Sequence, residues 1–371
     1  MKVVVIGGGI AGLAACTGIR SYADDELEVI LVEPKDHIEV FWASYRSLFD
    51  AEMAQSSIFS LEKYAFKHSV KHIQSTAQEL TDHQVKLANG VTIEFDVCVL
   101  AMGASMPYHG LGRGFEAASN TRADRLKALA TSGLQVILVK TVLIVGGGLV
   151  GSELAGDIAV YSKNASNSTR VILVHSGDHL CPEMNDKAGQ AVKTKLEELG
   201  VKVILNEKAV KNSAGKMVLE SSGKVIEADQ VVMTVGIDPM NSFVDPGYLN
   251  QEGWVEVDEY FQVKGAGGKL FAFGDCCTLL PNTGYGALQN INVIGYNIKQ
   301  TLNSKKVGSS QLPSLSKYYN PLEAYICTVG PDDGVIFTPY CSCDCLIPRF
   351  KNYSMFLFEV RYKLGLEAEI A

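Results

Sequence analysis

The 371-residue sequence predicts an α/β fold built from two similar units, each opening with a strand, a glycine loop and a helix. The segment VVVIGGGIAGLA at 3–14 has a similar counterpart, VLIVGGGLVGSELA, at 142–155. The first glycines of the two loops, Gly7 and Gly146, are 146 − 7 = 139 positions apart. That spacing is too long for a solenoid repeat and fits two separate βαβ units.

Composition limits the function classes. With 47% hydrophobic residues the chain can bury a substantial core and is expected to form two or three domains. A formal charge of −8 and a pI near 5.5 argue against broad nucleic-acid binding, which needs clustered Lys and Arg. Nine cysteines, an odd number, and no secretory leader before the first strand predict an intracellular, cytoplasmic protein with mostly free thiols.

No membrane span is expected. The longest apolar stretch, 134–151, is interrupted by Lys140 and dense in glycine, so it is interpreted as a strand, a turn, a second strand and the glycine loop. Position 2 is Lys2 rather than glycine, so no N-myristoylation signal is expected either.

The first unit carries the fingerprint of a dinucleotide site. Gly7 allows the tight turn, Gly9 lets a pyrophosphate approach the backbone, and Gly12 allows close packing of the helix on the strand. The next β-rich run ends in Glu33, 33 − 7 = 26 positions after Gly7, where an acid accepts ribose hydroxyl hydrogens. In the loop that follows, Lys35 and Arg46 could each neutralise the charge of a diphosphate or of a reduced flavin. The alternative is that each is a solvated charge on the loop.

The strand at 92–105 closes on Ala101-Met102-Gly103, and here the chain resembles the two-dinucleotide-binding flavoprotein superfamily. The resemblance implies two Rossmann-like domains in a glutathione-reductase-like arrangement, one for FAD and one for NAD(P)H. That superfamily usually has Ala-Thr-Gly at this crossing, so Met102 replaces a hydroxyl. Ala101 and Gly103 are carried over as FAD contacts.

The second unit resembles the superfamily's NAD(P)H site through Gly146, Gly148 and Gly151. Glu153, two residues on, either meets the nicotinamide ribose or simply favours the helix dipole. Where an NAD-specific strand ends in an acid, this one ends in His175, which does not repel a 2′-phosphate. The choice between NADH and NADPH therefore stays open.

Later motifs follow the superfamily's order. Gly236 closes the nicotinamide unit, and KLFAFGD ends in Gly274-Asp275, where the aspartate holds the flavin's ribitol in that superfamily. A single helix over 284–298 would then direct its first turn, around Ala287, at the flavin.

Cysteine spacing argues against a disulfide reductase. No CxxC or CxxxxC follows the first glycine loop, and Cys276 and Cys277 are adjacent rather than spaced as a redox pair. The cluster CSCDC at 341–345 is interpreted as strand thiols, because its spacing is tighter than zinc sites use. No metal site is predicted.

The closest resemblance is to the ferroptosis-suppressor branch of apoptosis-inducing-factor-like oxidoreductases, through VEPKDHIEVFWASYRSLFD and GPDDGV…RFKNYSMFLF. It implies electron transfer from NADH or NADPH through FAD to a quinone of the ubiquinone or vitamin K type. By this resemblance Lys351 and Phe356 lie near the flavin as catalytic residues. Taken alone, the alternation at 355–364 predicts a half-buried strand, and Phe356 is then a core residue.

The predicted FAD domain has two parts, 1–108 and 253–303, and the NAD(P)H domain, 109–252, is inserted between them. A C-terminal α+β cap is predicted at 304–371. A hairpin is expected at EAYICTVGPDDGVIFTPY and would form one wall of a quinone slot. A weak contact with a lipid surface is expected from the basic residues of 346–366, which are Arg349, Lys351, Arg361 and Lys363.

Two alternatives stay open beside the quinone. One is another electron acceptor, such as ascorbate radical, a ferredoxin-type protein or oxygen. The other is a redox-responsive binding protein, in which NADH reduces the flavin and the long-lived reduced state changes partner binding. The oligomeric state is left open.

Overall fold

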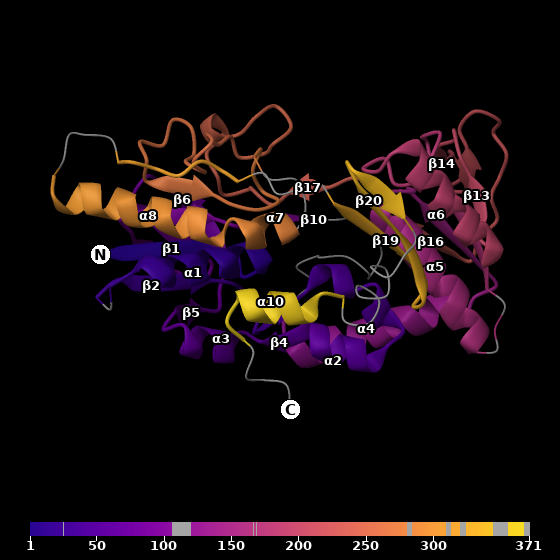
Figure 1. Ribbon diagram of the computed structural model, residues 1–371, viewed down its shortest axis with the longest axis horizontal. Coiled ribbons are helices and arrows are strands. Elements are labelled where there is room, and N and C mark those ends of the chain that lie inside the picture. The colour runs from indigo at the N-terminus through magenta and orange to yellow at the C-terminus, as the bar shows by residue number, and fades with distance from the viewer. Residues whose placement is uncertain are drawn as a thin grey trace.

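The structure is a computed structural model that describes residues 1–366 apart from 25, 106–119, 166, 168, 280–283, 309–312, 320–323 and 344–354. Two parallel sheets lie side by side along the long axis of the molecule, and they confirm the predicted α/β fold with two similar units (Figure 1).

The first sheet has five parallel strands in the order β18, β9, β1, β2, β5. Their bounds are Leu270–Ala272, Val97–Leu100, Lys2–Ile6, Glu28–Val32 and Lys71–Ile73. Strand β1 is buried on both sides: Val3 and Val5 pack in one core cluster, Val4 and Ile6 in another. Its unbroken apolar run is therefore that of a parallel strand covered on both faces.

Helices cover one face of this sheet and an antiparallel meander covers the other. The helices are α1 (Ile10–Tyr22), α3 (Leu61–Lys67) and α8 (Ile291–Lys306), and the meander strands are β6 (Ala77–Leu80), β7 (Gln84–Leu87) and β8 (Thr92–Glu94). Helices α1 and α8 approach each other at Gly18 and Gly295. A Cβ on Gly18 would lie 2.2 Å from the carbonyl oxygen of Ile291, so the crossing needs glycine.

The second sheet has four strands, which repeat the arrangement of β5, β2, β1 and β9 in the first. Its parallel strands run β13, β12, β11, β16, with bounds Lys202–Ile204, Arg170–Val174, Thr141–Val145 and Gln230–Met233. Helices α5 (Leu149–Asn164) and α6 (Asp186–Glu198) pack on one face, and the hairpin of β14 (Ala209–Lys211) and β15 (Met217–Leu219) packs on the other. The two units meet through a short antiparallel pair, β10 (Ala104–Ser105) with β17 (Asp238–Pro239).

An excursion between β2 and β5 joins the units a second time. It contains β3 (His37–Glu39), η1 (Phe41–Ala43), η2 (Arg46–Leu48), α2 (Ala51–Ser57) and β4 (Ile58–Ser60). Leu48 and Ile58 pack in the core cluster of the second unit, together with Leu129 of α4 (Arg122–Ile137). Helix α4 corrects the interpretation of 134–151: its last turns, not a strand, precede β11.

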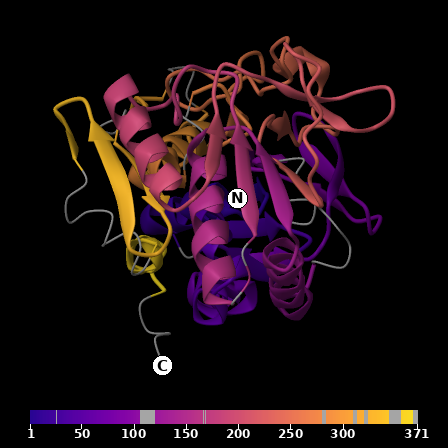
Figure 2. The ribbon, with the colours of Figure 1, turned by 90° about the vertical axis from the view of Figure 1, so that its right-hand side faces the viewer.

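The C-terminal part contains the predicted hairpin, formed by β19 (Tyr325–Val329) and β20 (Asp333–Thr338), with β21 (Cys341–Cys343) beside β20. The hairpin lies against the helices of the second unit (Figure 2). A Cβ on Gly156 of α5 would lie 2.7 Å from the backbone nitrogen of Gly330, so glycine allows this close approach.

The strand expected at 355–364 is wrong: Leu357–Lys363 forms helix α10. Leu357, Val360 and Leu364 are buried at helical spacing, while Phe358 and Tyr362 are exposed. Over so short a segment, the alternation of apolar and charged residues fits the period of a strand and that of a helix. Packing on the first unit selects the helix.

The single helix expected over 284–298 is also corrected. It divides at Asn290 into α7 (Gly284–Gln289) and α8. The side chain of Asn290 is fully buried and donates from Nδ2 to the carbonyl oxygens of Gly286 and Tyr319. The break therefore ties the loop before β19 to the start of α8.

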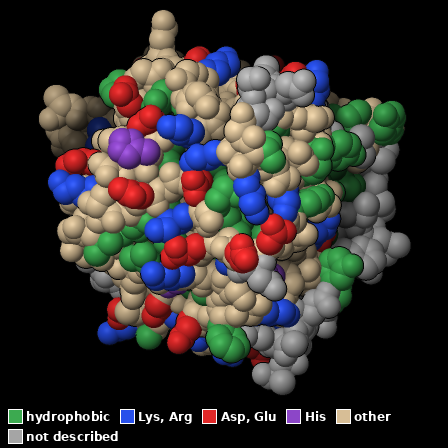
Figure 3. Space-filling model, turned by 90° about the vertical axis from the view of Figure 1, so that its left-hand side faces the viewer, with side chains coloured by type: hydrophobic (Ala, Val, Ile, Leu, Met, Phe, Trp, Pro, Cys, Tyr) green, Lys and Arg blue, Asp and Glu red, His purple; other side chains and the backbone are tan. Residues whose placement is uncertain are grey.

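The outer face at the β2 and α8 end of the molecule carries Lys and Arg interspersed with Asp and Glu (Figure 3). Ion pairs join Lys299 to Asp24 and Lys269 to Asp82. Within the described residues, no helix combines the length and the apolar character that crossing a membrane requires.

Candidate active site

The loop between β1 and α1 is shaped by three glycines with different tasks. Gly7 has φ +106°, and a Cβ there would lie 2.3 Å from the carbonyl oxygen of Ala101. A Cβ on Gly12 would lie 1.8 Å from the carbonyl oxygen of Gly7. A Cβ on Gly9 would have no atom of another described part of the chain within 4 Å, so the middle glycine leaves open space in front of the first turn of α1. That space is the cradle a pyrophosphate needs.

Glu33 stands at the end of β2 with only 4% of its surface exposed. Its Oε2 accepts a hydrogen bond of 2.6 Å from the backbone N–H of Gly8, and its Oε1 accepts one of 3.1 Å from the N–H of Lys35. The ammonium of Lys35 lies 3.7 Å from the same Oε1. The carboxylate is thus fixed beside the glycine loop, with lone pairs left for ribose hydroxyls.

A cleft of about 560 Å³ runs along the carboxyl ends of the first sheet. Eight predicted cofactor residues line it: Gly7, Gly9, Glu33, Lys35, Ala101, Gly103, Asp275 and Ala287. Sequence reasoning missed further residues of its wall, which include His37, Glu39, Trp42, Ser75, Arg125 and Asn241. Only the aromatic-rich loop after Glu33 was a signal for part of this wall.

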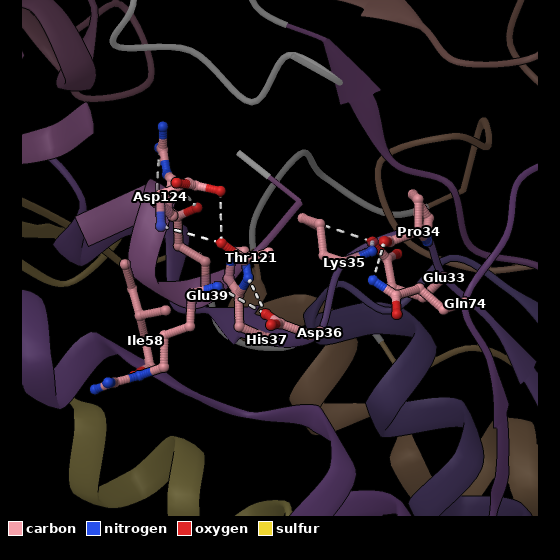
Figure 4. A network of polar contacts seen from close by, with 12 residues as sticks. Glu33, Pro34, Lys35, Asp36, His37, Glu39, Ile58, Gln74, Thr121 and Asp124 are labelled. Atoms are coloured by element: carbon pink, nitrogen blue, oxygen red, sulfur yellow. Dashed lines mark hydrogen bonds and ion pairs between the residues drawn. The ribbon is translucent and has the colours of Figure 1, made fainter. Parts of the chain in front are cut away.

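His37 lines the cleft and has one buried ring nitrogen without a hydrogen-bond partner among the described residues. Its ring is fully buried, and Nδ1 lies 3.0 Å from Oδ1 of Asp36, which also accepts from the N–H of Arg122 (Figure 4). Burial is the main cause that lowers the pKa of His37, against the opposing effect of Asp36, so the ring is neutral at neutral pH. Nδ1–H donates to Asp36, and Nε2 has no partner within the described part of the chain. A hydroxyl of a bound ribose or ribitol fits this unsatisfied nitrogen.

Glu39 and Arg125 form a buried ion pair in the same wall. Nε and Nη2 of Arg125 donate to the two carboxylate oxygens at 2.9 and 2.8 Å, and the hydroxyl of Ser44 donates to Oε1 at 2.5 Å. Burial alone would raise the pKa of Glu39, but Arg125 and Ser44 outweigh it and hold the pKa below its usual value. The pair therefore stays ionised and carries no net charge.

The second glycine loop repeats the first with one change. Gly146 has φ +113°, and a Cβ on Gly151 would lie 1.9 Å from the carbonyl oxygen of Gly146. At Gly148 the nearest atom to such a Cβ is Oε1 of Glu183 at 3.6 Å, so this loop too has room for a group. His175 takes the place of the acid, and its Nδ1 accepts from the N–H of Gly147 at 3.1 Å.

Glu153 lies in the first turns of α5 and is 4% exposed. Its Oε1 accepts hydrogen bonds from the N–H and the hydroxyl of Thr328 on β19, at 2.9 and 3.0 Å. The C-terminal hairpin therefore fixes the carboxylate that the resemblance assigns to the nicotinamide ribose. Gly236 has φ +81°, with open space around it.

The structure argues against Arg46 as a diphosphate ligand. Its guanidinium is buried, donates from Nε to both carboxylate oxygens of Asp157 at 3.1 Å, and donates from Nη2 to the carbonyl oxygen of Gly330 at 3.0 Å. Arg46 does not line the cleft. It joins the excursion of the first unit to α5 and to the C-terminal hairpin.

Of the two predicted catalytic residues, Lys351 lies outside the described residues. Phe356 precedes α10 with φ +56° and is half-buried. The neighbouring carbonyl oxygen of Met355 accepts a hydrogen bond of 2.7 Å from Nε1 of Trp42, which lines the cleft. The C-terminal segment therefore reaches the cleft through this tryptophan.

No cysteine lines this cleft among the residues that the structure describes. Cys276 and Cys277 follow Asp275 and are buried, as are Cys16, Cys98, Cys181 and Cys327. Burial raises the pKa of Cys276 well above that of an exposed thiol. Across the described residues no cluster of three His, Cys, Asp or Glu side chains is arranged to hold a metal ion.

These observations fit the two nucleotides implied by the sequence: an open cradle at Gly9, an acid beside it, an unsatisfied acceptor on His37, and a second open cradle at Gly148. The fold and the paired loops define a flavoprotein with two dinucleotide-binding domains. The chain belongs to the pyridine nucleotide-disulphide oxidoreductase family, whose model matches residues 1–295. It is an NAD(P)H-dependent flavoprotein oxidoreductase, and the family implies FAD and NAD(P)H as its cofactors.

Known proteins confirm the resemblance to ferroptosis-suppressor and apoptosis-inducing-factor-like proteins. Ferroptosis suppressor protein 1 of Taeniopygia guttata is 27% identical over 351 residues, which cover 90% of this chain and 88% of the relative. Apoptosis-inducing factor homolog A of Dictyostelium discoideum is 28% identical over 360 residues, covering 90% and 84%. The sulfide:quinone oxidoreductase of Aquifex aeolicus shares the fold, with a TM-score of 0.75 at 17% identity over 98% of this chain and 92% of that one.

Proposed function

We propose that the protein is an NAD(P)H:quinone oxidoreductase. The reaction is NAD(P)H + H⁺ + quinone → NAD(P)⁺ + quinol, in which a hydride carries two electrons and one proton, and the second proton comes from solvent. Bound FAD would supply the hydride-accepting chemistry, held by Glu33 and the loop at Gly9. The chain itself supplies binding, orientation and shielding from water.

The observation that carries this proposal is the character of the cleft wall around Trp42 and Gly284. Within the described residues its wall has aromatic and small side chains, Phe41, Trp42, Gly284 and Ala287, and it has no cysteine. A reductase that passes electrons through a dithiol needs a redox pair beside the flavin, whereas a flat apolar acceptor needs an apolar slot. The related sulfide:quinone oxidoreductase, which by its name acts on a quinone, supports the same acceptor class.

The geometry of the two glycine loops supports a role for each of the residues around them. Glu33 and the loop at Gly9 would hold the adenosine ribose and pyrophosphate of FAD, with Asp275 on the ribitol side. The loop at Gly148 would hold the pyrophosphate of NAD(P)H, and Glu153 the nicotinamide ribose. Buried His37 would accept a hydroxyl hydrogen of FAD at Nε2.

A weak lipid contact through the C-terminal segment remains part of the proposal, in a narrower form. Phe358 and Tyr362, 64% and 60% exposed, share one side of α10 at i and i+4, next to Lys363. Arg361 is engaged elsewhere, because its Nη2 donates to the carbonyl oxygen of Ser56. Arg349 and Lys351 lie outside the described residues. Sedimentation with anionic vesicles, for the parent and for Phe358→Ser/Tyr362→Ser, tests this contact.

Anaerobic stopped-flow tests the function directly. The FAD-loaded protein is reduced with NADH or NADPH and then mixed with a short-chain ubiquinone, while flavin absorbance is followed. Reoxidation faster than with oxygen is the expected result. A flavin that reduces readily but is not reoxidised by any quinone would overturn the proposal and favour a redox-responsive binding protein.

A further inference from the structure

Trp42 is an aromatic wall of the cleft that the sequence did not single out. Its indole lies in η1 at the end of the cleft that also contains Gly284 and Ala287. A Cβ on Gly284 would lie 2.1 Å from Cζ3 of Trp42. The six-membered ring therefore occupies the space that a side chain at 284 would take, and the glycine fixes the ring from that side.

The other edge of the indole is held by the C-terminal segment. Nε1–H donates to the carbonyl oxygen of Met355 at 2.7 Å. Met355 is 2% exposed and has φ +47°, and the next residue, Phe356, has φ +56°. Residues other than glycine disfavour this left-handed backbone conformation. It persists where the surrounding structure imposes it, often at functional sites. Here it brings the Met355 carbonyl to the indole.

An aromatic ring held at two edges presents a fixed surface to the cleft. Trp42 is only half-buried, and it lines the cleft with the surface that remains. Flat aromatic partners stack on such a ring in offset geometry. The ion pair of Arg125 with Glu39, three residues before Trp42 along the chain, lines the same cleft. Its two charges neutralise each other. This part of the wall therefore suits a neutral planar ring better than an anion.

We propose that Trp42 is a specificity-determining residue of the electron-acceptor site and packs against the neutral ring of a quinone-class acceptor. The inference rests on the proposed function and deepens it, because it names the residue that selects the acceptor. Met355 acts as a positioning residue through its carbonyl oxygen. The nicotinamide half of the reaction does not depend on the indole.

The chain's two tryptophans make the proposal directly measurable. Trp254 does not line the cleft, so Trp254→Phe leaves Trp42 as the only tryptophan and keeps the site intact. Adding a short-chain ubiquinone to the oxidised, FAD-loaded Trp254→Phe protein is expected to quench tryptophan emission with saturation. In Trp42→Phe, where only Trp254 emits, no saturable quenching is expected. Equal quenching in both variants, or none in Trp254→Phe, would overturn the proposal.

Kinetics provide a second readout. Trp42→Ala is expected to raise the KM for ubiquinone about tenfold, and Trp42→Phe about threefold or less, since the ring is kept. Reduction of the flavin by NADH, the affinity of the apoprotein for FAD, and turnover with ferricyanide, a small anionic acceptor, should change less than twofold. Loss of FAD affinity with an unchanged quinone KM would show that the indole faces the cofactor, and would overturn the proposal.

Activity of the parent protein distinguishes a failure of the proposed function from a failure of the role of Trp42. If the parent protein reduces no quinone in stopped-flow, the proposed function is wrong whatever Trp42 does. If the parent reduces ubiquinone and Trp42→Ala does so with the same KM, the function stands and the role of Trp42 is wrong.

Discussion

Glu33 and His175 occupy equivalent places in the two units and make the same contact. Glu33 follows β2 and accepts from the N–H of Gly8 at 2.6 Å, and His175 follows β12 and accepts from the N–H of Gly147 at 3.1 Å. A neutral imidazole therefore replaces a carboxylate in the second dinucleotide loop. Burial is the main cause that lowers the pKa of His175, which keeps the Nδ1 lone pair available for Gly147 at neutral pH.

This exchange predicts how nucleotide preference responds to mutation. His175→Glu is expected to reduce kcat/KM for NADPH about tenfold or more, because a carboxylate at this position repels the 2′-phosphate. NADH should be affected less than about threefold, since glutamate can accept from Gly147 as Glu33 does from Gly8. His175→Asn, which stays neutral, is the control. Flavin reduction followed with both nucleotides measures this, and equal losses for NADH and NADPH would mean that position 175 only shapes the loop.

Substitution of the middle glycine of each loop is expected to affect one nucleotide site and not the other. The added methyl group of Gly9→Ala has no atom of another described segment within 4 Å, so the variant should fold normally while its affinity for FAD falls about tenfold or more. Gly148→Ala is the matched variant: it should keep FAD and lose affinity for NAD(P)H. Apoprotein titration with FAD and stopped-flow reduction distinguish the two losses. A Gly9→Ala protein that binds FAD normally would place the pyrophosphate elsewhere.

The buried pair of Arg46 and Asp157 predicts a loss of stability rather than of cofactor. Arg46→Met leaves Asp157 charged and buried without its partner, which typically costs about 3–5 kcal/mol. The urea midpoint, measured at saturating FAD, should fall clearly, and the double variant Arg46→Met/Asp157→Leu should recover much of it. FAD affinity of the folded fraction should be unchanged. A normal midpoint with weakened FAD binding would instead support the diphosphate contact expected from sequence.

Local motifs account for what could be predicted from the sequence. The glycine loops, the acid at Glu33 and the apolar strands depend on neighbours within one βαβ unit, so their spacing predicts their structure. Arg46 pairs with a residue 111 positions away, and nothing near it in the sequence indicates that partner. A cation in a loop after an acidic strand end therefore looks like a ligand until the long-range packing is known.

The missed wall of the cleft has the same cause. His37, Trp42 and Arg125 come from β3, η1 and α4, and they meet the cofactor loops only because the excursion and α4 fold back across both units. Helix α10 was missed for a different reason. Seven residues can satisfy the period of a strand or of a helix, and burial of Leu357 and Val360 decides between them.

Three histidines, one fully buried and two half-buried, predict how stability depends on pH. Burial is the main cause that lowers the pKa of His37, His68 and His175, whereas in the unfolded chain each titrates near 6.5. The unfolded state therefore binds more protons below that pH, so the free energy of unfolding is highest above pH 6.5 and falls as the pH decreases through it. The pKa of Glu39 is held below 4.5, so its contribution to the free energy of unfolding is lost only at lower pH.

Thermal melts of the FAD-loaded protein between pH 8 and 5.5 test this, with Tm expected to fall toward the acid end. His68 is the simplest of the three to replace, because its Nε2 contacts the carbonyl oxygen of Leu364 at 2.8 Å and glutamine can keep that hydrogen bond. His68→Gln should melt like the parent at pH 8 and lose less stability at pH 5.5, because one of the three titrations is removed. A parent Tm that is constant or rises on acidification would show that these rings are not held neutral by burial.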